Sequence, residues 1–243
     1  MMKIVVAAVA ALVSFAGSAS AASLIPVGNT TTEGNAGNVI PFNTRFVPQQ
    51  YQQIWDASVF GTDPLTITAI SFRVEGIFED FPGGPTELVL GFTTTSAEVD
   101  GLSNTLADNI GTPLVTVAQN PVMGSASGGA LPNGEPNPFG ATITFDTPYE
   151  YDPANGNLLM DVSILSEVGP SGFDAVDTVG DATSRAVTSP LGVTNDSVGL
   201  VVAFEVSEGG GAVVPLPAGI WLSLTALVGL GMIGRRRTGP TFA

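Results

Sequence analysis

The sequence contains no cysteine and no histidine. Without cysteine, disulfides cannot hold the fold, and thiolate nucleophiles and Cys/His zinc sites are excluded. Without histidine, the chain lacks the usual general base near neutral pH, and Ser/His/Asp catalysis is impossible. Neither a G-x-S-x-G elbow nor a phosphate-binding P-loop is present. We therefore predict that the protein is not an enzyme and has no cofactor, apart from the calcium alternative considered below.

Basic residues are also scarce and unevenly placed. The chain has seven Lys and Arg against 22 Asp and Glu. Four of the seven basic residues lie near the two ends, whereas all acidic residues lie between Glu33 and Glu208. The central region has three basic residues against 22 acidic ones, a net charge of −19. Such a field repels nucleic acid and anionic lipid, so we expect no nucleic-acid partner.

Residues 1–22 show the three regions of a signal peptide in order. Lys3 gives a positive start, Ile4 to Phe15 is almost wholly apolar, and small residues follow. Ala19-Ser20-Ala21 fits an A-x-A cleavage site, and a cut after Ala22 also fits. The apolar run, of about 12 residues, is short for a membrane span. We predict a cleaved signal peptide, with an uncleaved anchor or a buried helix as the alternatives.

The C-terminal segment has three parts that follow a flexible, glycine-rich linker at 209–213. Val-Pro-Leu-Pro-Ala occupies 214–218, an uncharged stretch continues to Gly234, and three arginines follow at 235–237. As a helix, 218–234 would extend about 25 Å, near the lower limit for crossing a bilayer core. The prolines keep the strip before the helix extended, and the arginines hold its end in the cytoplasm. We predict a transmembrane helix over 218–234 and a short tail over 238–243.

The order of proline motif, short apolar helix and arginine cluster over 214–237 resembles the VPLPA-type variant of the PEP-CTERM sorting domain. Members of that family are exported proteins of Gram-negative bacteria that make exopolysaccharide, and a membrane-embedded exosortase cleaves them near the proline motif. The resemblance implies that the recognition motif of a substrate is Val214, Pro215, Leu216, Pro217 and Ala218, and that Arg235, Arg236 and Arg237 stop transfer. The tail after the arginines departs from many members but leaves the motif intact. A plain single-pass anchor is the alternative.

The region 23–208 has the apolar alternation of strands. In Leu158–Ile164 and in Val198–Val206, every second residue is apolar. From Leu65 to Val74 the alternation slips by one residue at Ile70, which indicates a bulge or a corner between sheets. Further predicted strands are Thr142–Phe145, Gln53–Phe60, Glu87–Thr93, Leu114–Ala118 and Ser171–Val179.

Turn signals separate these segments, and the Gly- and Pro-rich stretch 120–140 predicts a long irregular loop. We therefore predict an all-β fold: a single β-sandwich, jelly-roll-like domain flanked by the signal peptide and the transmembrane helix. Parts of it (49–61, 70–73 and 151–162) resemble segments that recur in PEP-CTERM surface proteins, a resemblance that implies no particular activity.

Three groups of residues are candidate sites. Asp152, Asn155 and Asn157 place oxygen ligands for calcium in one turn, although such residues also form turns without metal. Two acidic sets could supply a glycosidase carboxylate pair or form a solvated edge: Glu75, Glu79 and Asp80, and Asp174, Asp177 and Asp181. Tyr51, Trp55, Tyr149 and Tyr151 could stack on exopolysaccharide sugars or pack in a core.

The sequence thus favours one function and leaves two others open. The favoured one is an exported surface or extracellular-matrix protein, first a single-pass precursor in the inner membrane, then sorted and cleaved by an exosortase. The alternatives are a carbohydrate-binding module for exopolysaccharide and, third, a carboxylate-pair glycosidase.

Overall fold

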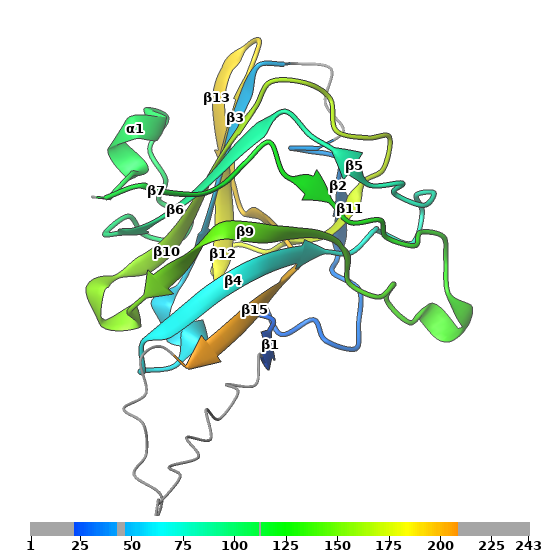
Figure 1. The fold of residues 1–243 in the computed structure, drawn as a ribbon, viewed down its shortest axis with the longest axis horizontal. Coiled ribbons are helices and arrows are strands. Elements are labelled where there is room, and N and C mark those ends of the chain that lie inside the picture. The colour runs from blue at the N-terminus through cyan, green and yellow to red at the C-terminus, as the bar shows by residue number, and fades with distance from the viewer. Residues whose placement is uncertain (1–21, 43–46, 112, 209–243) are drawn as a thin grey trace, which may run out of the picture. The chain divides into compact units, whose positions relative to one another are not determined.

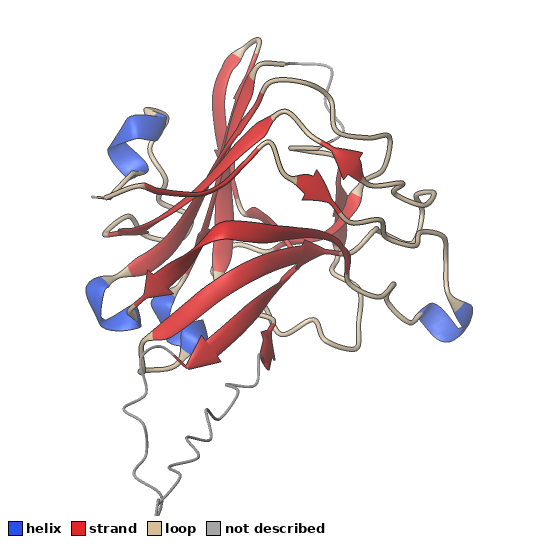
Figure 2. Cartoon of the chain, viewed as in Figure 1, coloured by secondary structure: helices blue, strands red, loops and turns tan. Residues whose placement is uncertain are grey.

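The computed structural model describes residues 22–42, 47–111 and 113–208, and within these ranges the chain is all-β, as predicted (Figures 1 and 2). The strands are β1 (Ala22–Leu24), β2 (Ala36–Asn38), β3 (Gln49–Trp55), β4 (Leu65–Phe72), β5 (Gly84–Pro85), β6 (Leu88–Thr95), β7 (Val115–Gln119), β8 (Val122–Met123), β9 (Gly140–Tyr151), β10 (Asn157–Ile164), β11 (Phe173–Asp177), β12 (Thr183–Ser189), β13 (Gly192–Asp196), β14 (Val198–Leu200) and β15 (Val202–Glu208). The helical elements are single turns: α1 (Leu106–Asn109) and the 3-10 turns η1 (Ala57–Phe60), η2 (Pro132–Gly134) and η3 (Pro153–Asn155).

Two antiparallel sheets enclose the main core. One has the order β1-β15-β4-β9, and the other has the order β13-β12-β3-β10-β6-β7. Buried side chains from both sheets form one hydrophobic cluster. Trp55 of β3 and Phe92 of β6 both meet Phe204 of β15, with ring centroids 5.2 and 6.0 Å apart. The fold is therefore sandwich-like, with β14-β11-β2 and β5-β8 as smaller sheets beside it.

The six-stranded sheet is covered on its outer face as well. Ile54 and Leu159 pack there against Leu102 and Leu106, which belong to the segment that contains α1. Beside them, the Gln52 amide donates to Asp161 Oδ1 at 2.9 Å and accepts from Asn109 Nδ2 at 2.9 Å. Gln52 is thus fully buried although it is polar, because its hydrogen bonds are made inside the domain.

The structure corrects the predicted position of one strand. The expected strand 53–60 is instead β3, which ends at Trp55, followed by the 3-10 turn η1. The Asp56 carboxylate caps η1 by accepting from the Ser58 backbone N–H at 2.8 Å. The glutamines at 49–53 lack the apolar alternation of a half-buried strand, so the pattern placed the strand about four residues too late.

The slip of alternation at Ile70 reflects a β-bulge, one of the two alternatives that the sequence indicated, rather than a corner between sheets. The register of β4 shifts between Ile67 and Ala69 against β9, and the register of β15 shifts opposite the same place. Ile67 and Ile70 are therefore both buried although three positions separate them.

The segment Val198–Val206 has the buried face that the sequence predicted, but it forms two strands rather than one. β14 belongs to the three-stranded sheet and β15 to the four-stranded sheet, so the chain changes sheets at Val201. The other predicted strands correspond to β6, β7, β10, β11 and part of β9. The stretch 120–140 is mostly irregular but contains β8 and η2.

The first and last strands of the domain are neighbours. β1 pairs antiparallel with β15, and Ala22 lies opposite Val206. Leu65 pairs with both Glu208 and Tyr151, so the starts of β1 and β4 lie with the ends of β15 and β9. We call this end the basal end; in Figure 1 it is at the bottom of the domain. The opposite end, which carries the β12–β13 turn at 189–192, is the distal end.

Candidate functional site

The targeting segments lie almost wholly outside the described residues. This holds for Ala19, Ala21, the motif 214–218 and the arginines 235–237, so their roles stay predictions. Ala22, the remaining cleavage-site residue, is the first residue of β1. No helix within the described ranges has the length and apolarity needed to cross a membrane.

The predicted calcium residues lie in the turn between β9 and β10. Asp152 caps η3: its Oδ1 accepts from the Ala154 N–H at 3.0 Å and its Oδ2 from Asn155 Nδ2 at 3.1 Å. Asn157 bonds elsewhere, accepting from the Ala57 N–H at 2.9 Å and donating to the Ala97 carbonyl at 2.9 Å. The structure therefore brings Asp152 and Asn155 together as a capped turn, while Asn157 ties the turn to neighbouring segments.

Asp174, from the second acidic set, forms a buried ion pair with Arg73. The Asp174 Oδ2 accepts from Arg73 Nε at 2.6 Å, and the two side chains are 0% and 1% exposed. Arg73 also donates to the carbonyls of Asn29 at 2.7 Å and Thr32 at 2.6 Å, while Asp174 Oδ1 accepts from the Gly34 N–H at 2.7 Å. The pair thus holds the segment between β1 and β2 against β11.

Glu75, from the first acidic set, lies beside this ion pair. Its side chain is buried, and Oε2 has no hydrogen-bond partner. Burial, followed by the charges of Glu33 and Asp174, raises the pKa of Glu75 to about 7. Glu75 therefore carries a proton for part of the time at neutral pH. The structure brings the two acidic sets together at this one pair, Glu75 and Asp174.

The other acidic candidates act as acceptors in loops. Asp80 accepts from the Gly128 N–H at 2.8 Å, and Glu79 is exposed. Asp177 accepts from Ser197 Oγ at 2.7 Å, and Asp181 accepts from the Thr183 N–H at 2.9 Å. Within the part of the chain that the structure describes, no group of three or more acidic side chains is placed to hold a metal ion.

The four aromatic candidates for sugar stacking are core residues. Tyr51 and Trp55 are fully buried, and Tyr149 and Tyr151 are 6% and 1% exposed. Tyr149 packs against Phe92, and Tyr151 packs against Phe60. None of the four has a face open to a sugar ring, so of the two alternatives, stacking on saccharides and packing in the core, the structure supports packing in the core.

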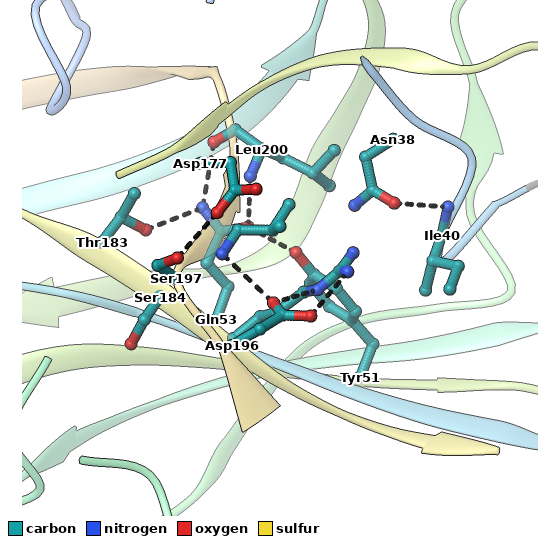
Figure 3. Close-up of polar contacts among 12 residues, drawn as sticks. Asn38, Ile40, Tyr51, Gln53, Asp177, Thr183, Ser184, Asp196, Ser197 and Leu200 are labelled. Atoms are coloured by element: carbon teal, nitrogen blue, oxygen red, sulfur yellow. Dashed lines mark hydrogen bonds and ion pairs between the residues drawn. The ribbon is translucent and has the colours of Figure 1, made fainter. Parts of the chain in front are cut away.

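A buried polar network surrounds Gln53, and the sequence did not predict it (Figure 3). Gln53 Oε1 accepts from Tyr51 Oη at 2.7 Å and from the Leu200 N–H at 2.9 Å, and its Nε2 donates to the Leu200 carbonyl at 2.9 Å. The side chain of Gln53 therefore acts as a strand neighbour that attaches β14 to β3. Its only signal in the sequence is a glutamine-rich stretch beside apolar residues.

Arg185 and Asp196 extend this network toward the surface. Arg185 donates to Asp196 through Nε at 2.7 Å and through Nη2 at 2.9 Å. The two residues line a hollow of about 340 Å³ together with Asp100, Leu102, Val179, Ser184, Asn195 and Ser197. Its lining offers hydrogen-bonding groups but contains neither an aromatic ring nor a nucleophile paired with a base.

Comparison with known proteins found no match among family models, curated proteins or solved structures.

Proposed function

We propose that this protein is an exported bacterial surface or extracellular-matrix protein without catalytic activity. The signal peptide 1–22 directs export, the helix 218–234 holds a precursor in the inner membrane, and an exosortase cleaves near 214–218. One observation carries the proposal: the ordered parts of a signal peptide and of a sorting segment flank the domain on either side. The strands begin at Ala22 and end at Glu208, which is compatible with a cut on each side of the domain.

We further propose that the domain is a single β-sandwich of the jelly-roll type. Apart from β12 and β13, the two main sheets contain eight strands, which are in chain order β1, β3, β4, β6, β7, β9, β10 and β15. If these eight strands are numbered from one to eight, the sheet β1-β15-β4-β9 has the order 1-8-3-6. The neighbouring strands β3-β10-β6-β7 of the other sheet have the order 2-7-4-5. This order is that of two interlocked Greek keys, with the β12–β13 hairpin added at one edge.

The described side chains support a structural rather than a catalytic role. Asp80, Asp174 and Asp181 accept hydrogen bonds from loop backbone, and Asp174 also pairs with an arginine. The acidic surface suits a soluble protein in an extracellular matrix, because like charges keep copies apart. Arg73 and Asp174 then serve to hold the fold together in the absence of disulfides.

Mass spectrometry of the secreted form tests the proposal. We expect its peptides to begin at Ala22 or Ser23 and to end near Pro217. If every copy retains Arg237 and stays in the membrane fraction, the chain is instead a permanent single-pass anchor.

A matched pair of variants tests the motif itself. Replacing Pro215 and Pro217 with alanine should abolish processing and leave the longer precursor in the membrane fraction. Pro240→Ala, in the tail after the arginines, should be processed like the unmodified chain. Equal processing of all three forms would exclude the proline motif as the recognition element.

A further inference from the structure

The hollow beside Arg185 lies at the β13 edge of the six-stranded sheet. It is formed by the end of β13, the start of β12, the β11–β12 turn and the segment that follows β6, and Figure 3 shows three of its lining residues, Ser184, Asp196 and Ser197. Its volume of about 340 Å³ lies at the lower end of the range of small-molecule sites, which is roughly 300–1,000 Å³. The hollow is therefore large enough for one small molecule.

Hydrogen bonds between distant segments fix the walls of the hollow. The Asp100 N–H donates to Ser184 Oγ at 2.8 Å, and Asp100 Oδ2 accepts from the Gly180 N–H at 2.7 Å. Asn195 Nδ2 donates to the Leu102 carbonyl at 2.5 Å. The domain's own contacts thus hold the walls in place, so little ordering is needed when a ligand binds.

The unused hydrogen-bonding capacity of the hollow is mainly that of acceptors. Among the described residues, no group donates to Asp100 Oδ1 or to Asn195 Oδ1, whereas Asn195 Nδ2 is engaged. Ser184 is 1% exposed, and its hydroxyl proton has no acceptor within the same ranges. A ligand that matches these groups offers several donors and at least one acceptor.

The hollow also carries a carboxylate without a counter-charge. Asp196 is paired with Arg185, but Asp100 takes part in no ion pair with another described residue. Burial and, to a smaller extent, the charges of Asp100 and Asp177 raise the pKa of the neighbouring Asp181. The negative field therefore extends across the β11–β12 turn, where it repels anions and attracts cations.

We propose that this hollow binds a small ligand that carries a primary ammonium group beside hydroxyl groups, the chemistry shared by amino sugars and amino alcohols. The ammonium group donates to Asp100 Oδ1, and the hydroxyl groups bond to Asn195 Oδ1 and to the Ser184 hydroxyl. The carbon atoms of the ligand lie against Leu102 and Val179. The site is independent of the export and processing proposed above, because residues of the domain alone form it.

Titration of the full chain in non-ionic detergent micelles, followed through its backbone amide signals by NMR, tests the proposal. Protonated glucosamine should shift the amide signals of Asp100, Gly180 and Ser184 and saturate with a Kd on the order of 1 mM. Glucose, which has a hydroxyl in place of the ammonium group, should bind about fivefold more weakly. Equal affinity for the two sugars, or shifts that do not saturate, would overturn the proposal.

Ethanolamine distinguishes the two sources of this chemistry. It has the ammonium group and one hydroxyl group but no sugar ring. Tighter binding of glucosamine than of ethanolamine would assign the hollow to an amino sugar, and the reverse order would assign it to an amino alcohol.

A matched pair of variants separates this site from the general negative charge of the chain. Asp100→Asn removes the charge but keeps an acceptor for the Gly180 N–H, and asparagine tolerates the positive φ of 60° at this position. We expect it to weaken glucosamine binding about fivefold and to change glucose binding less. Unchanged circular dichroism ensures that the comparison is made on folded protein.

Asp146→Asn is the control. It removes the same charge from β9, where Asp146 accepts from the Gln119 N–H of β7, at the opposite edge of the six-stranded sheet. This variant should bind glucosamine like the unmodified chain. Equal weakening by both variants would show that the ligand follows the overall charge of the protein rather than this hollow.

Discussion

Two ion pairs of the domain join an arginine to an aspartate in different surroundings. Arg73 and Asp174 are 1% and 0% exposed, whereas Arg185 and Asp196 are 11% and 32% exposed. Arg73 reaches two backbone carbonyls besides Asp174 and lies 5.1 Å from the centre of the Phe139 ring. Arg185 leaves Nη1 buried and without a partner.

The two pairs therefore differ in how much each contributes to the stability of the fold. Removing one partner of the buried pair leaves a bare charge in a low-dielectric interior, which is strongly destabilising. The Arg185–Asp196 pair is partly exposed to water, so we expect the free energy lost on breaking it to be smaller and to depend on salt.

Breaking the buried pair should have the largest effect. Asp174→Ala leaves the Arg73 guanidinium without its counter-charge and the Gly34 N–H without its acceptor. We expect the free energy of unfolding to fall by about 3–5 kcal/mol, measured by urea denaturation with circular dichroism. The exposed neighbour Asp177 provides the control: Asp177→Ala should cost less than about 1 kcal/mol. A similar small loss for both variants would show that the buried pair adds no stability.

Removing Arg185 should have a smaller effect. Arg185→Met breaks the pair with Asp196 but also removes the unpartnered buried Nη1. We expect a loss of about 1–2 kcal/mol in the same denaturation experiment, because Asp196 stays partly hydrated and still accepts from the Val198 N–H. A loss as large as that of Asp174→Ala would erase the distinction between the two pairs.

Glu75 makes the surroundings of the buried pair sensitive to pH. The pKa of Glu75 rises from 4.5 to about 7 in the folded protein, so between these values the folded state binds more protons than the unfolded state. Its contribution is present in full below pH 4.5 and is lost as the pH rises through 7. Glu75→Gln should raise Tm at pH 8 by about 2–4 °C relative to wild type and flatten this dependence.

Thermal unfolding between pH 5 and pH 8 checks the prediction. The exposed neighbour Glu79 supplies the matched variant, and Glu79→Gln should keep the pH dependence of the unmodified chain. If Glu75→Gln and Glu79→Gln change the profile equally, then Glu75 is not the group that titrates.

Salt should produce the smallest difference. At 0.5 M NaCl, the loss caused by Arg185→Met should shrink by a few tenths of a kcal/mol, because ions screen partly exposed charges. The loss caused by Asp174→Ala should stay the same within error. Equal screening in the two variants would mean that water reaches Arg73.

The sequence predicted the apolar strands well and the polar ones poorly. Leu158–Ile164 and the bulge near Ile70 were readable, because alternation reports which face of a strand is buried. β3 was misplaced, since Gln52 and Gln53 are buried through hydrogen bonds to residues far away in the chain. No local pattern can indicate such partners. The hairpin β12–β13 was missed for a similar reason, as its residues are largely polar.

The candidate sites show the same limit. Asp152 was recognised as a turn residue from its neighbours in sequence, and it caps that turn. The pairing of Arg73 with Asp174 joins positions 101 residues apart, and the position of Glu75 beside them depends on the same long-range packing. Spacing within the chain therefore gave the residue types of this cluster but not their contacts.

The shortness of β1 has a further consequence for the edge of the four-stranded sheet. These three residues cover the outer edge of β15, which is seven residues long. A bare strand edge offers unpaired backbone groups to any extended peptide nearby. Removing the chain up to and including Leu24 would uncover the backbone of Phe204 to Val206, so a domain shortened in this way should polymerise more readily by strand addition.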